Sequence, residues 1–134
     1  MKTAAHSTYT GPGRIVISRG PPRRAIGGFR IYRQLAPTNE IRALTDQHAY
    51  RIKYRAEVLS LLDPRSTWNE LHQLAGDAEP VLQCFERPPF TDDNWCHRRM
   101  VADWLQETIG AVVDELEPEA PEQRAAHLAA WRAR

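Results

Sequence analysis

Both cysteines of the chain, a histidine and three arginines lie in the short stretch CFERPPFTDDNWCHRR, residues 84–99. Cys84 opens this stretch, and Cys96 and His97 follow each other directly near its end. A thiol beside an imidazole and a guanidinium can act as a nucleophile, because nearby positive charge favours the thiolate. The same residue types could also ligate a metal, form a redox pair or bind an anion.

A metal site is one interpretation of this cluster. Cys84, Cys96 and His97 could supply three ligands, with Glu86 or His48 as the fourth. Eleven residues separate the cysteines and the histidine is adjacent to the second one, which is not a standard zinc pattern, and the chain has no second cysteine pair. We therefore expect no metal here, and no residue pattern points to a particular cofactor.

Thiol chemistry leaves several alternatives open. Cys84 and Cys96 could form a redox pair if the loop between them folds back, or Cys96 could act as a nucleophile with His97 as its base. Both cysteines could instead be structural, buried like small hydrophobic residues. A phosphatase-type cysteine is excluded, because an arginine would be needed six positions later, where Phe90 and Ala102 stand.

The elements that must position these residues alternate between strands and helices. Short apolar runs predict buried strands at 14–18 and 81–85, and AVVDEL at 111–116 is a third candidate. Helical spacing and capping residues predict the remaining elements. A helix is expected over 46–62, and a second over 64–75, where Asp63-Pro64 offers a cap and a first-turn proline and Thr67 with Glu70 fits a capping box. A third helix, capped by Asn94, is expected to begin at Trp95 or Cys96, and a C-terminal helix lies within 121–134. This order predicts an α/β fold, a small three-layer sandwich with a short, mostly parallel sheet flanked by helices.

Length and composition fit one ordinary globular domain. The chain has 134 residues, of which 42% are hydrophobic and 26% charged. We predict a single α/β domain over 1–134, with 1–13 flexible and 114–134 forming a C-terminal helical tail. We see no signal peptide and no apolar run long enough to span a membrane, so we expect a cytoplasmic protein whose thiols stay reduced and which has no membrane partner.

Charge is distributed unevenly along the chain. Residues 1–39 hold seven Lys or Arg and no Asp or Glu, so the rest of the chain holds 11 basic and 17 acidic residues within a net charge of +1. The basic segment could attract an anionic partner such as a nucleotide or nucleic acid. It could equally neutralise the acidic remainder by packing against it.

The expected topology gathers the polar residues at one edge of the sheet. Ligands of open parallel sheets bind outside the carboxyl ends of the strands, and the first turn of a helix favours anions. We therefore predict an anion-binding site at this edge. Its predicted ligand-binding residues are Ser18, Arg19, Cys84, Glu86 and Arg98, and its predicted catalytic residues are Cys96 and His97.

The stretch EPVLQCFERPP followed by NWCHRRMVADWLQETIG resembles the signature of domain of unknown function 488, a widespread bacterial and archaeal family. The resemblance rests on a strand that ends at Cys84, with Glu86 two residues later, and on Cys96, His97 and Arg98 opening a helix. It covers most of residues 15–113 and implies a compact α/β fold in which the two motifs meet. Typical members begin with an apolar strand, whereas this chain has a short polar start, so that opening strand is expected to be absent.

These observations lead to one main hypothesis of function and two alternatives. The main hypothesis is a small α/β protein that binds a phosphate-bearing ligand, a nucleotide or a nucleic acid at the cysteine and Cys-His-Arg cluster. The first alternative is a non-catalytic interaction module in which Arg98 and Glu86 pair to fasten the loop to the sheet. The second alternative is a thiol-dependent or metal-dependent enzyme.

Overall fold

A computed structural model describes residues 1–133 and shows one sheet of five strands, all paired in parallel, in the order β3-β2-β4-β1-β5. The α/β fold class predicted from the sequence is confirmed. The strands are β1 (Lys2–Ala5), β2 (Arg14–Val16), β3 (Arg30–Ile31), β4 (Val81–Cys84) and β5 (Asp114–Glu115). The helices are α1 (Asn39–Arg42), α2 (Gln47–Glu57), α3 (Pro64–Ala75), α4 (His97–Ile109) and α5 (Pro121–Arg132), with short 3₁₀ turns at Arg33–Leu35 and Leu59–Leu61.

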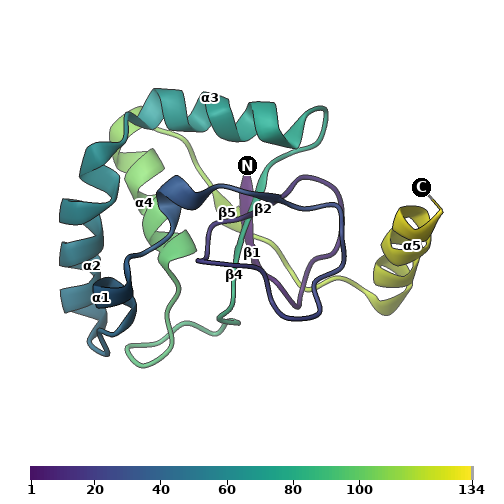
Figure 1. Cartoon of the computed structure of the whole chain (residues 1–134), viewed down its shortest axis with the longest axis horizontal. Coiled ribbons are helices and arrows are strands. Elements are labelled where there is room, and N and C mark those ends of the chain that lie inside the picture. The colour runs from purple at the N-terminus through teal and green to yellow at the C-terminus, as the bar shows by residue number, and fades with distance from the viewer. Residues whose placement is uncertain (134) are drawn as a thin grey trace.

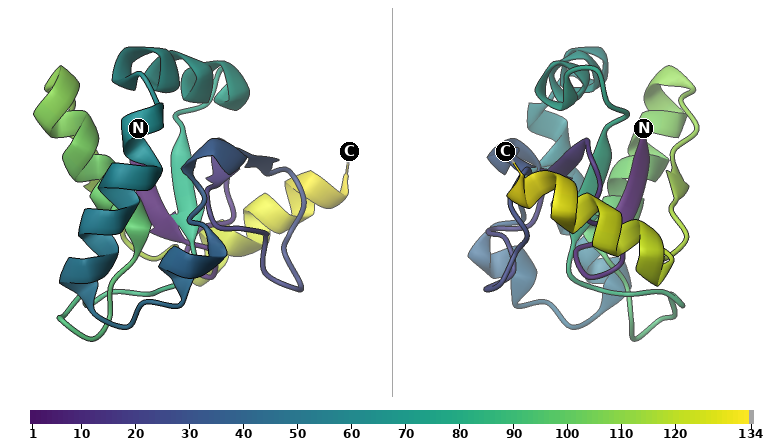
Figure 2. Two further views of the ribbon diagram at one scale, coloured as in Figure 1. Left: turned by 60° about the vertical axis from the view of Figure 1, so that its left-hand side comes forward. Right: turned by 90° about the vertical axis from the view of Figure 1, so that its right-hand side faces the viewer.

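The two faces of the sheet are covered differently. Helices α1–α4 gather on one side, whereas α5 lies apart on the other (Figures 1 and 2). Ile15 and Leu82 are paired in register on β2 and β4, and both are fully buried in the core cluster that also contains Leu71 of α3 and Leu105 of α4. The main hydrophobic core therefore lies between the sheet and α1–α4.

Loops cover the opposite face of the sheet. Val16 and Gln83 alternate with the core residues along β2 and β4, and both are buried. The Gln83 side chain donates a hydrogen bond of 2.9 Å to the Tyr9 carbonyl, which holds the loop between β1 and β2 against the sheet. Helix α5 has no buried residue and rests on these loops, where Arg124 donates to the Ser7 carbonyl.

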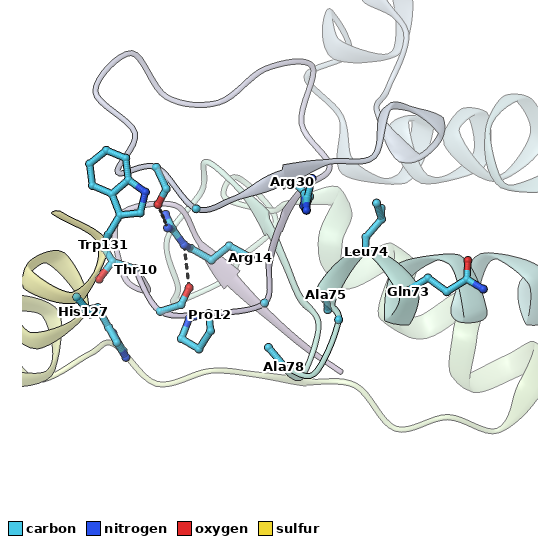
Figure 3. Close-up of a pocket in the computed structure, with 16 residues that line it drawn as sticks. Thr10, Pro12, Arg14, Arg30, Gln73, Leu74, Ala75, Ala78, His127 and Trp131 are labelled. Atoms are coloured by element: carbon cyan, nitrogen blue, oxygen red, sulfur yellow. Dashed lines mark hydrogen bonds between the residues drawn. The ribbon is translucent and has the colours of Figure 1, made fainter. Parts of the chain in front are cut away.

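Arg14 ties two of these loops together. Its Nε donates to the Gly11 carbonyl at 2.9 Å and its Nη1 donates to the Ile26 carbonyl at 2.7 Å, while Nη2 donates to the Gly27 carbonyl. Two of these bonds are drawn beside Trp131 of α5 in Figure 3. The rigid guanidinium fork satisfies three carbonyl groups from two separate segments, which a single ammonium group cannot do with the same geometry.

The prediction that residues 1–13 are flexible is wrong for Lys2–Ala5. This segment is strand β1, which pairs with β4 on one side and β5 on the other, and Ala4 and Ala5 are fully buried. An opening strand is therefore present after all. The sequence Lys-Thr-Ala-Ala gave little strand signal because it lacks the β-branched aliphatic and aromatic side chains typical of strands.

Several predicted element boundaries also change. The helix predicted over 46–62 ends at Glu57, and the strand predicted over 111–116 is only Asp114–Glu115. Asn94 does not cap α4, whose N-cap is Cys96, but donates to the Arg87 and Pro89 carbonyls at 2.7 and 2.8 Å. Asn94 therefore fastens the loop before α4.

Helix α3 begins at the predicted Asp63-Pro64 cap, but the predicted capping box does not form. The side chain of Asp63 accepts a hydrogen bond from the Ser66 amide at 2.8 Å, so Asp63 is the N-cap. Thr67 and Glu70 lie inside the helix and do not form a capping box. Glu70 instead accepts a hydrogen bond from the Tyr32 hydroxyl.

Among residues 1–133, none of the helices combines the length and the apolar character that a membrane crossing needs.

We expect Arg14→Lys to lower the free energy of unfolding by about 1–3 kcal/mol, because a lysine leaves at least one of the three carbonyls without its partner. Urea unfolding followed by circular dichroism measures this loss. The matched control is Arg30→Lys, since Arg30 is exposed. Equal losses in the two variants would show that Arg14 does not hold the loops together.

Candidate functional site

The two cysteines meet where β4 ends and α4 begins. Cys84 is the last residue of β4, Cys96 is the N-cap of α4, and the structure joins them as a disulfide with a Cα–Cα distance of 6.9 Å. Both residues are buried. We expected two reduced thiols, whereas the structure shows a disulfide. The loop of residues 85–95 folds back and brings the two sulfurs together, as a redox pair requires.

Arg98 lies fully buried beside this pair. Its Nε and Nη2 donate to the two carboxylate oxygens of Glu115 at 2.9 and 2.7 Å, and its Nη1 donates to Cys84 Sγ at 3.2 Å. Thr3 donates a third hydrogen bond to the same carboxylate at 2.6 Å. The carboxylate that pairs with Arg98 is therefore Glu115, and not Glu86 as the interaction-module alternative expected; the side chain of Glu86 is exposed.

His97 faces the sheet from the first turn of α4. Its Nε2 lies 2.7 Å from the Ile17 carbonyl, which can only accept, so Nε2 carries the ring hydrogen. This leaves Nδ1 unprotonated, 4.0 Å from Cys96 Sγ. Burial, assisted by the charge of Arg98 and opposed by the hydrogen bond to Ile17, lowers the pKa of His97 to about 4. The imidazole is therefore neutral at pH 7.

His6 is a site residue that the sequence analysis missed. It follows β1, and its Nε2 lies 3.1 Å from the hydroxyl of Ser18, which itself donates to the Gly20 carbonyl at 2.7 Å. Its ring packs edge-on against Phe85 at 4.7 Å between centroids. Burial lowers the pKa of His6 to about 4. The sequence did not indicate His6 because β1 itself was not predicted. His6 was therefore not recognised as a residue at the end of a strand.

A cavity of about 580 Å³ opens at this edge of the sheet, and a second of about 180 Å³ adjoins it. The larger one is bordered by five of the predicted residues, namely Ser18, Arg19, Cys84, Glu86 and His97, and the smaller one is bordered by Cys96 and His97. Arg98 borders neither cavity. The structure thus brings the predicted residues other than Arg98 together around the two cavities, whereas the Arg98 side chain is buried inside the protein.

Arg42 and Tyr50 line both cavities and were not predicted. Arg42 ends α1, and Tyr50 lies on α2, where its helical spacing assigned it only to the core. Burial raises the pKa of Tyr50, and the nearby Glu86 raises it further. Within residues 1–133, neither Arg19 nor Arg42 has a carboxylate at ion-pair distance, so both bring unpaired positive charge to the cavity wall.

A hollow of about 560 Å³ at the opposite end of the strands lies between the loops and α5 (Figure 3). Trp131 and His127 border it from α5, and Arg14 borders it from β2. It contains no cysteine, and the Arg14 guanidinium is already bonded to backbone carbonyls. Both cysteines therefore border the cavities at the carboxyl edge, and not this hollow.

We expect Glu115→Ala to lower the free energy of unfolding by about 3–5 kcal/mol, because it leaves the guanidinium of Arg98 buried and unpaired. The control is Glu107→Ala, which removes the exposed bidentate partner of Arg55 and should cost less than about 1 kcal/mol. Chemical denaturation of both variants measures the difference. A cost for Glu115→Ala no larger than that of the control would contradict the anchoring role of this ion pair.

We also expect the stability of the disulfide form to fall as the pH drops from about 6.5 towards 4. In the unfolded chain a histidine takes up a proton near its ordinary pKa of about 6.5, whereas buried His6 and His97 do so only near pH 4. The unfolded state therefore binds more protons in this window, which costs roughly 2 kcal/mol per histidine by pH 5. Above pH 7 this contribution is constant.

Urea unfolding at pH 7.5, 6 and 5 tests this expectation. His6→Gln should lose part of the pH dependence, whereas His48→Gln, a change at an exposed position on α2, should keep all of it. A pH dependence that is the same in both variants would show that His6 is not held neutral by burial.

Comparison with known proteins identifies one family. The family model described as domain of unknown function DUF488 matches residues 18–105. This range includes the two cysteines, His97, Arg98 and all four residues shared by the two cavities. No curated protein and no solved structure matches the chain.

Proposed function

This chain belongs to the DUF488 family, and because the family description states no activity, we propose its function from the chemistry of its own site. The proposed function is thiol–disulfide exchange, in which Cys84 and Cys96 alternate between a disulfide and a dithiol. The observation that carries this proposal is that each sulfur has a different polar partner: the Arg98 guanidinium for Cys84 and the neutral His97 imidazole for Cys96.

The two partners make the sulfurs chemically unequal. A buried guanidinium that donates to Cys84 Sγ at 3.2 Å favours a thiolate at that position. Cys96 caps the N-terminus of α4, which also favours a thiolate, but its side chain makes no hydrogen bond to the helix amides. The side-chain atom near its sulfur is the unprotonated Nδ1 of His97 at 4.0 Å, which donates no hydrogen bond to a thiolate. Since the more stable thiolate is the better leaving group, an incoming thiolate should attack Cys96 and release Cys84.

The exchange balances with two molecules of a small thiol, RSH. The first loses its proton to solvent, and its sulfur forms a bond to Cys96 Sγ while the Cys84–Cys96 bond breaks and leaves a Cys84 thiolate. The second RSH also loses its proton to solvent, and its sulfur bonds to the external sulfur while the bond to Cys96 Sγ breaks. RSSR leaves, and the Cys96 thiolate takes a proton from solvent. The protein disulfide gains two electrons, and the two thiols lose them.

The cavity indicates the charge of the reacting molecule. Arg19 and Arg42 border the same cavity as Cys84 and outnumber Glu86, its one acidic residue among residues 1–133, and the volume of about 580 Å³ suits a small molecule. These two arginines support the expectation of an anionic partner. In this proposal Arg42, and not the buried Arg98, binds the anion. We therefore propose a negatively charged low-molecular-weight thiol or disulfide as the partner. A phosphate-bearing ligand, nucleotide or nucleic acid would need the same two guanidinium groups.

A structural module is the second candidate function. The Arg98–Glu115 pair fastens α4 to β5 and would account for the arginine of the Cys-His-Arg motif without any ligand. In that case the disulfide would be a further cross-link that stabilises the fold. The two candidates differ in whether the sulfurs exchange with external thiols while the protein stays folded.

The test equilibrates the oxidised full-length protein with buffers of reduced and oxidised glutathione, which is an anionic thiol, and counts free thiols by alkylation and mass spectrometry. We expect two thiols to appear reversibly without loss of the circular dichroism signal, and the trapped mixed disulfide to map to Cys96. No reduction short of unfolding would favour the structural module.

Reduction rates then test the charge of the partner. Arg42→Gln should slow reduction by glutathione several-fold but leave reduction by the neutral thiol 2-mercaptoethanol unchanged, because only glutathione interacts with the guanidinium. Arg51→Gln is the control, since Arg51 is exposed on α2 and borders neither cavity. Protection by adenosine monophosphate or a single-stranded oligonucleotide would extend the ligand class to phosphates. If Arg42→Gln changed the two reduction rates by the same factor relative to the unmodified protein, the partner would not be recognised by its negative charge.

A further inference from the structure

We propose that the reduced form of this protein binds one zinc ion through Cys84, Cys96 and His97. The three donor atoms are Cys84 Sγ, Cys96 Sγ and His97 Nδ1, and all lie within 4.8 Å of one another. Two thiolates and one imidazole form a donor set that suits zinc. This inference rests on the proposed function, because the sulfurs must first be released from their disulfide.

The orientation of His97 is the strongest support for a metal. Ligating histidines almost always donate their other ring N–H to a carbonyl or carboxylate, which fixes the tautomer and turns the free nitrogen towards the metal. His97 has this arrangement, with Nε2 at 2.7 Å from the Ile17 carbonyl and Nδ1 on the side of Cys96 Sγ. The ring is also held edge-on against Tyr54, at 5.5 Å between centroids.

The surroundings of the two sulfurs also fit a metal centre. Cys84 ends a strand and Cys96 caps a helix, so both donors are carried by regular elements rather than by a loose loop. The N–H of Arg98 that reaches Cys84 Sγ is the kind of outer hydrogen bond that stabilises a bound thiolate. Arg98 is itself fixed by Glu115, and its guanidinium lies 5.0 Å from the centre of the Phe90 ring.

The fourth position of the proposed site would be open. The cluster found among residues 1–133 has three donors, whereas zinc takes four ligands. The cavities bordered by Cys84, Cys96 and His97 also contain the exposed Glu86. Water, a small anion or Glu86 could therefore complete the tetrahedron. Three protein ligands with an accessible fourth position is the arrangement found in zinc sites that do chemistry.

Zinc and the disulfide exclude each other. Binding of Zn²⁺ to the reduced pair, a Cys84 thiolate and a Cys96 thiol, releases one proton and forms two Zn–S bonds. Oxidation of the zinc form by a disulfide RSSR returns two electrons to RSSR, forms the Cys84–Cys96 bond, releases Zn²⁺ and yields two RS⁻, which solvent protonates. The site would then act as a redox-controlled zinc site rather than a permanent one.

The experiment uses the full chain, reduced and kept without oxygen, and begins with a count of free thiols. Cobalt(II) is then titrated as a spectroscopic probe and displaced by zinc. We expect one cobalt per chain, a thiolate-to-cobalt charge-transfer band and tetrahedral d–d bands that disappear on zinc addition. Zinc should also protect both thiols of the unmodified protein from alkylation, a readout that depends on no variant.

Variants identify the ligands. Cys96→Ser and His97→Gln should each weaken cobalt binding by about 100-fold or more, which exceeds the roughly 10- to 100-fold typical of changes to outer partners. His48→Gln, at an exposed position, should leave binding unchanged. Glu86→Gln shifts the d–d bands only if Glu86 occupies the fourth position, and unchanged bands assign that position to solvent or an added anion.

The outcomes separate the two proposals. A protein that cannot be reduced while folded overturns both the thiol exchange and the zinc site. A folded protein with two free thiols that shows neither the charge-transfer band nor protection by zinc overturns the zinc site alone. Binding that His97→Gln leaves unchanged overturns the assigned ligand set.

Discussion

The buried ion pair between Arg98 and Glu115 is the contact on which the carboxyl edge of the sheet depends. One guanidinium connects α4 to β5 through two hydrogen bonds, reaches Cys84 at the end of β4 and lies over Phe90 in the intervening loop. A carboxylate oxygen of the same pair accepts from Thr3 on β1. Because an unpaired charge in this position would be strongly unfavourable, the pair fixes how three strands and one helix meet.

Once α4 is held in this way, the chemistry of its first turn follows. Cys96 and His97 are adjacent in the sequence, and the helix start directs the sulfur to Cys84 and the ring to the Ile17 carbonyl. The carbonyl determines which ring nitrogen carries hydrogen, and burial keeps the ring neutral. The cysteine pair, a neutral imidazole and a guanidinium thus lie close together, and Glu115 balances the charge of the guanidinium. This arrangement is the basis of the proposed exchange.

The cavity beside this cluster combines residues from distant segments. Arg19 follows β2, Arg42 ends α1 and Tyr50 lies on α2, yet all three border the same space as Cys84. The arginines in the N-terminal half of the chain have two different environments. Arg14 donates hydrogen bonds to backbone carbonyls of the loops on the far face of the sheet. Arg19 and Arg42, in contrast, have no carboxylate partner within the described residues.

The sequence alone determined the α/β class, the strands around Ile15 and Leu82, the helices with strong apolar spacing, and the grouping of Cys84, Cys96 and His97 at a strand end. These follow from local periodicity and from the rule that strand ends of a parallel sheet share an edge. Only the tertiary structure decided the remaining features. Strand β1 forms because it pairs with its neighbours, although its alanines have little strand propensity. The tertiary structure also selected Glu115 rather than Glu86 as the partner of Arg98, and it placed His6 and Arg42 at the site. Each of these depends on contacts between segments far apart in the chain, and local pattern carries no information about which distant partner a side chain will meet.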